Sequence, residues 1–338
     1  MMTSSHVSIC DSPIVKTKNL TRYFRLKSHF FDRNTTFLYA LNGVDIDIFP
    51  NEIFCVVGES GCGKTTLGRL IMGLDTPSQG EVYFGDQRID LNAQISTRER
   101  LKTRKRMQMI FQNPFASLNP RHRIDRILSE PLKILEKTWD KQKIDHHVEE
   151  MMEKVGADPK WKNRYAHEFS GGQRQRIAIA RALITKPDFV VADEPVSALD
   201  VSIQAQILNL LMDLSAHQTL SWLFITHDLS VVYHFGDRVA VMYMGNVVEM
   251  GKVKNIFEKA YHPYTQLLIS AIPSLSGGSL KSIKEPTQLP DPTHKMMGCA
   301  FHLRCPFARN RCREEKPLLK THSPSSLTAC HGVEEGWI

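Results

Sequence analysis

The sequence predicts an α/β protein with a parallel sheet, a helical insertion within it and a small cysteine-containing C-terminal domain. Three observations lead to this prediction. Apolar runs with strand character alternate with helical segments, as in parallel α/β folds. A stretch from about 113 to 186 has helical spacing without strand signals. Four of the seven cysteines lie beyond position 298, after a Ser- and Gly-rich linker at 273–279.

The first strong motif is a glycine-rich loop at 58–65 between the apolar run 53–57 and a helix-like segment. It reads G-E-S-G-C-G-K-T and matches the phosphate-binding pattern G-x-x-x-x-G-K-[ST]. Glycines allow consecutive N–H groups to turn toward an anion, and the helix N-terminus adds partial positive charge. A simple tight turn would need neither the flanking strand nor the helix. The residues expected to contact nucleotide are Gly58, Glu59, Ser60, Gly61, Cys62, Gly63, Lys64, Thr65 and Thr66.

Within this loop the chemistry can be assigned to particular side chains. Lys64 is expected to reach the β- and γ-phosphates, and the Thr65 hydroxyl to bind Mg²⁺. Cys62 lies between the loop's first glycine and Lys64, so its alkylation is expected to block nucleotide binding, and a bound magnesium–nucleotide complex to protect it.

The length, composition and charge of the chain limit the classes of protein to which it can belong. A length of 338 residues is typical of about two domains, and 42% hydrophobic with 23% charged residues is ordinary for a globular protein. The net charge of +7 and pI near 9.0 fit nucleic acid, an anionic membrane surface or a merely solvated basic surface. No apolar run approaches about 18 residues, and the N-terminus lacks an apolar signal region. We therefore expect a cytosolic protein or one held at a membrane through a partner.

In chain order, the pattern predicts two domains, 1–272 with its helical subdomain at about 113–186, and 273–338. Strands are expected at 14–20, 44–48, 53–57, 81–85, 107–111, 189–192, 222–225 and 239–242, a loop at 25–36 and a helix at 203–214. The basic run 98–106 could be a nucleic-acid or phospholipid patch, but such runs are more often solvated helix faces.

A second motif, F-S-G-G-Q-R-Q-R at 169–176, opens a helix. Ser170 and Gln173 form a capping-box pattern. Gly171 and Gly172 disfavour the helix that they open, which indicates that something approaches the backbone closely there. The alternatives are a well-capped structural helix and a second anion site at a helix N-terminus.

Polar residues follow three of the predicted strands. Asp193 and Glu194 end the run 189–192, where Asp193 could hold Mg²⁺ and Glu194 could orient or deprotonate a water molecule. Gln112 follows 107–111 and His227 follows 222–225. A lone histidine is more often structural, although here it also fits a γ-phosphate contact.

In this order, the motifs resemble those of an ATP-binding cassette (ABC) ATPase over about residues 14–250. The resemblance implies a P-loop NTPase with an ABC ATPase core and helical subdomain, forming a head-to-tail dimer with two ATP molecules at the interface. Phe169 stands where leucine is more general. Each site would combine the phosphate loop of one subunit with the signature of the other. The resemblance implies that Glu194, His227 and Gln112 are catalytic. It implies that Mg²⁺ is bound by Thr65, Gln112 and Asp193. It also implies further nucleotide contacts at Tyr23, Ser170, Gly171, Gly172, Gln173 and Asp200.

Four strings, at 57–64, 110–121, 169–176 and 262–268, resemble the oligopeptide/dipeptide importer branch, and Cys62 is closer to its F-type ATPase. This resemblance implies a heterodimer with a D-type ATPase, two permeases and, indirectly, a substrate-binding protein, at the cytoplasmic face of a bacterial inner membrane. The cargo, whether dipeptide, longer peptide, nickel chelate or sugar, would be chosen by the permeases and the binding protein.

Two other classes of protein share some of these features. A soluble ABC ATPase of translation or DNA repair suits the basic charge, but such proteins resemble tandem cassettes or carry long coiled-coil insertions. A kinase using the same phosphate loop leaves the motif at 169–176 unexplained. We therefore expect no nucleic-acid partner.

The tail contains Cys299, Cys305, Cys312 and Cys330. Disulfides are not expected in a cytosolic chain, which leaves a metal site or four reduced thiols. The spacing lacks tight C-x2-C pairs, which favours an iron–sulfur cluster over Cys₄ zinc. The tail also resembles this branch's C-terminal domain, whose members carry a [4Fe–4S] cluster. His302, His322 and His331 lie nearby and could replace a ligand.

Overall fold

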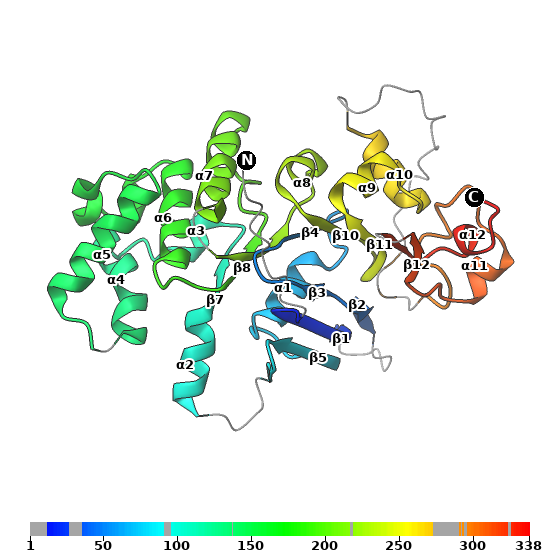
Figure 1. The fold of residues 1–338 in the computed structure, drawn as a ribbon, viewed down its shortest axis with the longest axis horizontal. Coiled ribbons are helices and arrows are strands. Elements are labelled where there is room, and N and C mark those ends of the chain that lie inside the picture. The colour runs from blue at the N-terminus through cyan, green and yellow to red at the C-terminus, as the bar shows by residue number, and fades with distance from the viewer. Residues whose placement is uncertain are drawn as a thin grey trace, which may run out of the picture.

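The computed structural model describes residues 12–26, 36–90, 96–136, 138–216, 219–272, 291, 293, 296–323 and 326–338. Figure 1 shows three regions in a row: helices α3 to α6, a central region of two sheets around α1, and a C-terminal region with β12, α11 and α12.

Eight strands of the described chain form the larger sheet, in the order β12-β13-β11-β10-β4-β9-β8-β7. From β10 to β7 neighbouring strands are parallel, whereas β11, β13 and β12 pair antiparallel. Their bounds are β4 Ile53–Val57, β7 Met107–Ile110, β8 Phe189–Asp193, β9 Ser221–Ile225, β10 Arg238–Tyr243, β11 Asn246–Lys252, β12 Lys320–Ser323 and β13 Ser326–Thr328. The carboxyl ends of β4, β9, β8 and β7 therefore lie together, which is where open α/β sheets bind ligands.

A second sheet contains five strands of the described residues, all antiparallel. They are β1 Val15–Arg25, β2 Phe37–Val44, β3 Asp47–Ile48, β5 Gln79–Phe84 and β6 Gln87–Arg88. Helix α1 (Lys64–Ile71) packs between the two sheets, against β9 and β8 on one side and β1, β2 and β5 on the other.

The strands of the parallel sheet alternate between two cores, as a period of two requires when both faces are covered. In β4, Phe54 and Val56 belong to the cluster around α1, and Cys55 and Val57 to the cluster on the opposite face. In the same way β9 points Leu223 toward α1 and Phe224 away from it.

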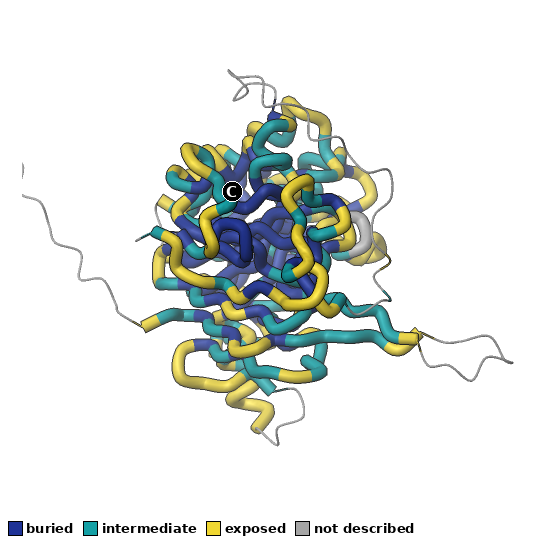
Figure 2. Tube along the Cα trace, turned by 90° about the vertical axis from the view of Figure 1, so that its right-hand side faces the viewer, coloured by how far each residue is buried: buried dark blue, intermediate teal, exposed yellow. Residues whose placement is uncertain are grey.

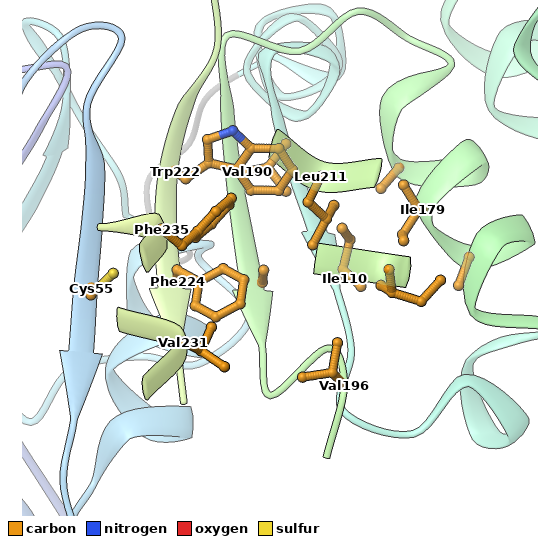
Figure 3. Packing of buried hydrophobic residues seen from close by; sticks show 14 of the residues in the cluster. Cys55, Ile110, Ile179, Val190, Val196, Leu211, Trp222, Phe224, Val231 and Phe235 are labelled. Carbon is orange, nitrogen blue, oxygen red and sulfur yellow. The ribbon is translucent and has the colours of Figure 1, made fainter. Parts of the chain in front are cut away.

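The second core runs from the sheet into the helical region. Figure 3 shows Trp222 and Phe224 of β9 next to Phe235, with Leu211 and Ile179 on the side of the helical region. The rings of Phe224 and Phe235 lie 4.7 Å apart. The helical elements are α3 Pro114–Ser117, α4 Ile124–Leu135, α5 Lys141–Lys154, the 3₁₀ turns Pro159–Asn163 and Ala166–Glu168, and α6 Gly171–Leu183. The remaining helices of the cassette are α2 Thr97–Arg106, α7 Val201–Ala216, α8 Leu229–Phe235, α9 Val253–Glu258 and α10 Pro263–Ser270.

The C-terminal region lies against the end of the larger sheet. Glu249 of β11 pairs with Thr328 of β13, so this region extends the sheet of the cassette. Two short helices, α11 Asn310–Glu314 and α12 His331–Glu334, complete it. Figure 2, which faces this region, shows its trace passing from exposed loops into the buried middle of the molecule.

Most expected elements are confirmed, with shifted boundaries. The expected strand 14–20 continues to Arg25, and the expected strand 44–48 is wrong, because β2 ends at Val44 and only Asp47–Ile48 forms β3. The expected loop 25–36 lies mostly outside the described residues. The basic run forms α2, which has a Ser96/Glu99 capping box and buries no residue, as expected for a solvated helix face. Throughout the described chain, every helix is too short or too polar to span a bilayer.

Candidate nucleotide-binding site

The phosphate loop connects β4 to α1 and is already curled around its lysine. Lys64, only 4% exposed, donates hydrogen bonds to the carbonyl oxygens of Gly58 at 2.8 Å and Glu59 at 3.0 Å. Gly63 has φ of +107°, and a Cβ there would lie 2.3 Å from the carbonyl oxygen of Ala40 in β2. The loop is therefore packed against β2. Lys64 has to exchange its carbonyl partners for phosphate oxygens when a nucleotide binds.

The other members of the loop divide by exposure. Ser60, Gly61 and Thr65 are exposed, and Thr66 is half-buried at the start of α1. Cys62 is only 3% exposed and packs in the core around α1. Burial raises the pKa of the Cys62 thiol, so the side chain lies beneath the loop as a neutral thiol.

Three expected magnesium ligands line one open cavity: Thr65, Gln112 and Asp193. The Thr65 hydroxyl donates to Asp193 Oδ1 at 3.1 Å. Asp193 is 3% exposed, and burial raises its pKa while the Thr65 hydrogen bond opposes the shift. A desolvated carboxylate beside a hydroxyl fits Mg²⁺, because a hard divalent cation would compensate the buried charge.

Glu194 lies at the centre of the polar groups beyond β8. Its carboxylate accepts a hydrogen bond from Gln112 Nε2 at 2.9 Å and lies 3.5 Å from His227 Nδ1. Its backbone N–H donates to Ile225 of β9 at 2.9 Å, with φ of +44°. A non-glycine residue in this conformation stores local strain, which is common at functional sites. The structure therefore brings together the three residues expected to be catalytic.

The signature residues lie at the start of α6, in the helical region. Ser170 and Gln173 form the expected capping box, with bonds of 3.0 and 3.4 Å. A Cβ on Gly172 would lie 2.6 Å from Cγ2 of Ile203, and one on Gly171 would lie 3.3 Å from Leu199. The close approach inferred from these glycines is thus made within the chain by α7 and the segment before it. Ser170 remains exposed.

Two further expected contacts lie outside the cluster around Glu194. Asp200 caps α7, since its Oδ1 accepts from Ile203 N at 3.2 Å. Tyr23 is half-buried on β1, edge-on to Phe37 at 5.3 Å and paired in register with Tyr39 of β2.

Some residues at the loop were not expected from the sequence. The Glu59 carboxylate accepts two contacts of 2.9 Å from Arg304, and the Glu59 N–H donates to the Tyr264 hydroxyl at 3.0 Å. Tyr264 belongs to the string 262–268, but nothing in its local pattern indicates this bond.

The four tail cysteines gather in one region as free thiols. Burial raises the pKa of Cys299 to about 12 and of Cys305 to about 11, and the charges of Cys330 and Cys312 add to both shifts. Cys299 N–H donates to the Cys312 carbonyl at 2.8 Å. Across the described residues, however, no group of three or more Cys, His, Asp or Glu side chains is arranged to hold a metal ion. The side chains as placed do not fit a metal cluster.

Comparison with known proteins assigns these motifs to a family. The family model described as ABC transporter matches residues 41–197, and the model described as oligopeptide/dipeptide transporter, C-terminal region, matches residues 248–312. The dipeptide transport ATP-binding protein DppF of Haemophilus influenzae is 46% identical over 96% of this chain and 98% of its own length. The chain belongs to the ABC transporter ATP-binding family.

Other relatives of this ABC ATPase agree. The oligopeptide transport ATP-binding protein AppF of Bacillus subtilis is 43% identical over 94% of the chain and 97% of its own length. The solved dimeric structure of a post-hydrolysis state of the ATP-binding cassette MJ0796, bound to ADP and Pi, covers 71% of the chain and 98% of its own, with a TM-score of 0.62 and 29% identity. The P-loop NTPase fold of the ABC ATPase and its ATPase activity follow from this membership.

Proposed function

We propose that this ABC ATPase energises the import of di- and oligopeptides across a bacterial inner membrane. It acts at the cytoplasmic face as the F-type subunit, together with a D-type ATPase, two permeases and, indirectly, a substrate-binding protein. The observation that supports this most is the joint presence of the ATPase site and the C-terminal region typical of oligopeptide/dipeptide transporters.

The site geometry explains how the chain would act. Lys64 and the loop N–H groups hold the phosphates, and a bound Mg²⁺ would neutralise phosphate charge between Thr65 and Asp193. Glu194 orients the attacking water and accepts its proton, while Gln112 and His227 hold that carboxylate. Ser170 is exposed at the start of α6, which leaves it free to meet a nucleotide bound by the partner ATPase. ATP binding closes the dimer, and hydrolysis permits its reopening.

Coexpression with candidate permeases and a D-type ATPase tests the proposal. We expect the chain to sediment with membranes only when the permeases are present, and peptide-dependent ATP hydrolysis to require both ATPases. Retention on nucleic acid without permeases would favour the soluble alternative. A competent homodimer with the permeases alone would overturn the heterodimer.

We also propose the four-cysteine region as a [4Fe–4S] or zinc site. Four thiols lie in that region, and the raised pKa values of Cys299, Cys305 and Cys330 disfavour their thiolates until a cation is bound. The side chains would have to rotate, because they are not arranged as ligands. Anaerobic purification with iron and zinc counting tests this: brown protein with iron supports the cluster, colourless protein with stoichiometric zinc supports zinc, and metal-free protein refutes both.

A further inference from the structure

Glu59, the second residue of the phosphate loop, is held by side chains from the far end of the chain. Arg304 Nη1 donates to both carboxylate oxygens of Glu59 at 2.9 Å, across a sequence separation of 245 residues. Tyr264 of α10 accepts the Glu59 N–H at 3.0 Å. Both the side chain and the N–H of Glu59 are thus bound to the C-terminal part of the chain, and the residue serves as an anchor point of the loop.

The arginine is buried where it makes this contact. Its side chain is 7% exposed, while that of Glu59 is 27% exposed. The guanidinium lies 5.7 Å from the ring centroids of Tyr243 and Phe301, and Nη1 is 3.5 Å from the Tyr243 hydroxyl. These rings and that of Tyr264 pack against one another at 4.6 to 5.4 Å. A buried guanidinium without a partner is costly, so the burial of Arg304 strongly favours the conformation in which it is paired with Glu59.

The anchor acts on the phosphate-binding Lys64 through the backbone. The carbonyl oxygens of Gly58 and Glu59 are the two that accept the Lys64 ammonium. The orientation of the peptide groups on either side of Glu59 therefore sets the resting position of that ammonium. The Glu59 carboxylate would also add a negative charge next to the phosphate site if Arg304 did not neutralise it, and like charges repel strongly where water is partly excluded.

Arg304 belongs to the segment 299–312, which contains Cys299, Cys305 and Cys312 and is called the cysteine segment below. It directly precedes Cys305, and its N–H donates to the Phe301 carbonyl at 3.0 Å, within the turn that starts at Cys299. The guanidinium can reach Glu59 only while this turn is folded.

We propose that Arg304 is a positioning residue of the nucleotide site, through which the folded cysteine segment neutralises Glu59 and sets the affinity of the phosphate loop for ATP. This rests on the ATPase function of the chain and not on the cargo or on any metal in the tail. The cysteine segment thus forms part of the same nucleotide site in the same chain.

Equilibrium ATP binding to the full chain, measured with a fluorescent analogue and by calorimetry, tests this with four variants. Arg304→Met should weaken ATP binding roughly 5- to 30-fold, because it leaves Glu59 uncompensated. Glu59→Gln in the Arg304→Met background should recover most of that loss, since the repelling charge is then gone. Arg304→Lys should lose less than Arg304→Met. Arg313→Met, which removes the same charge from an exposed position in α11, should bind as the wild type does.

The recovery in the double variant separates positioning from simple unfolding, because a misfolded segment would not be repaired at Glu59. In the assembled transporter, Arg304→Met should raise the KM for ATP with a smaller change in kcat. Tyr264→Phe, which removes only the acceptor of the Glu59 N–H, should weaken ATP binding without altering its salt dependence.

Wild-type affinity in Arg304→Met would overturn the proposal, and so would a double variant as weak as Arg304→Met. A wild-type chain that binds no ATP would instead contradict the proposed function itself, so the two failures are distinguishable.

Discussion

Replacing Gly63 by alanine tests how firmly the phosphate loop is built against β2. A Cβ there would lie 2.3 Å from the Ala40 carbonyl oxygen and 3.0 Å from Leu41 Cδ2, at φ of +107°. The backbone conformation costs an L-residue about 1–3 kcal/mol. Relieving the overlap with the packed strand β2 costs about another 1–3 kcal/mol. We therefore expect the free energy of unfolding to fall by about 4 kcal/mol.

Gly61→Ala is the matched control, because it lies in the same loop at φ of +78° and its Cβ would meet no atom within 4 Å. It should cost only a backbone term of about 1–2 kcal/mol, smaller than that at Gly63, because its φ lies closer to the left-handed region that L-residues can adopt. At roughly 2 °C per kcal/mol, thermal unfolding without nucleotide should place Gly63→Ala about 5 °C below Gly61→Ala. Equal melting temperatures would refute the reasoning, since the loop or β2 would then yield at no cost.

Three further outcomes are expected. Glu194→Gln should lower ATP hydrolysis by about 10²- to 10⁴-fold with ATP binding retained, measured by phosphate release and equilibrium binding; near-normal turnover would exclude Glu194 as the base. Cys62, whose pKa is raised by burial, should react with iodoacetamide far more slowly in the folded chain than in urea and more slowly again with Mg-ATP; unchanged ATP binding after complete modification would contradict its place in the loop. Burial lowers the pKa of His262 from 6.5 to about 3, so below pH 6.5 the unfolded chain takes up a proton that the folded chain does not, and stability falls by about 1.4 kcal/mol per pH unit. His262→Asn, which keeps an acceptor for the Tyr264 N–H, should flatten that fall in urea titrations between pH 6.5 and 5; an equally steep fall would assign it to other groups.

The parts of the site that follow a local pattern could be predicted from the sequence. The loop at 58–65 and the strand ending in Asp193 and Glu194 each combine an apolar strand with polar residues directly after it. Because parallel strands end on the same side of a sheet, such residues come together, and Gln112, Glu194 and His227 do so here.

The parts that depend on distant pairing could not be predicted. β2 lacks strict alternation of buried and exposed residues, and β13 has only three residues. The pairing of β11 with β13, in which Met250 lies opposite Leu327, joins segments far apart in the chain. No sequence pattern around Arg304 or Glu59 indicates the ion pair between them, because a single charged residue at either position is ordinary. The glycines at 171 and 172 did signal a close approach, but only the fold shows that Ile203 makes it.

The pairing of β13 with β11 also bears on how safely the chain can be shortened. Without residues 326–328, β11 would become an edge strand with unpaired backbone donors and acceptors. β11 also carries the apolar side chains of Val247 and Met250. Such an edge is a template for pairing with other chains. A cassette cut after residue 272 would therefore be prone to aggregation. In the intact chain the edge of β11 is also exposed during folding. β13 lies far from β11 in the sequence, so the two strands pair slowly.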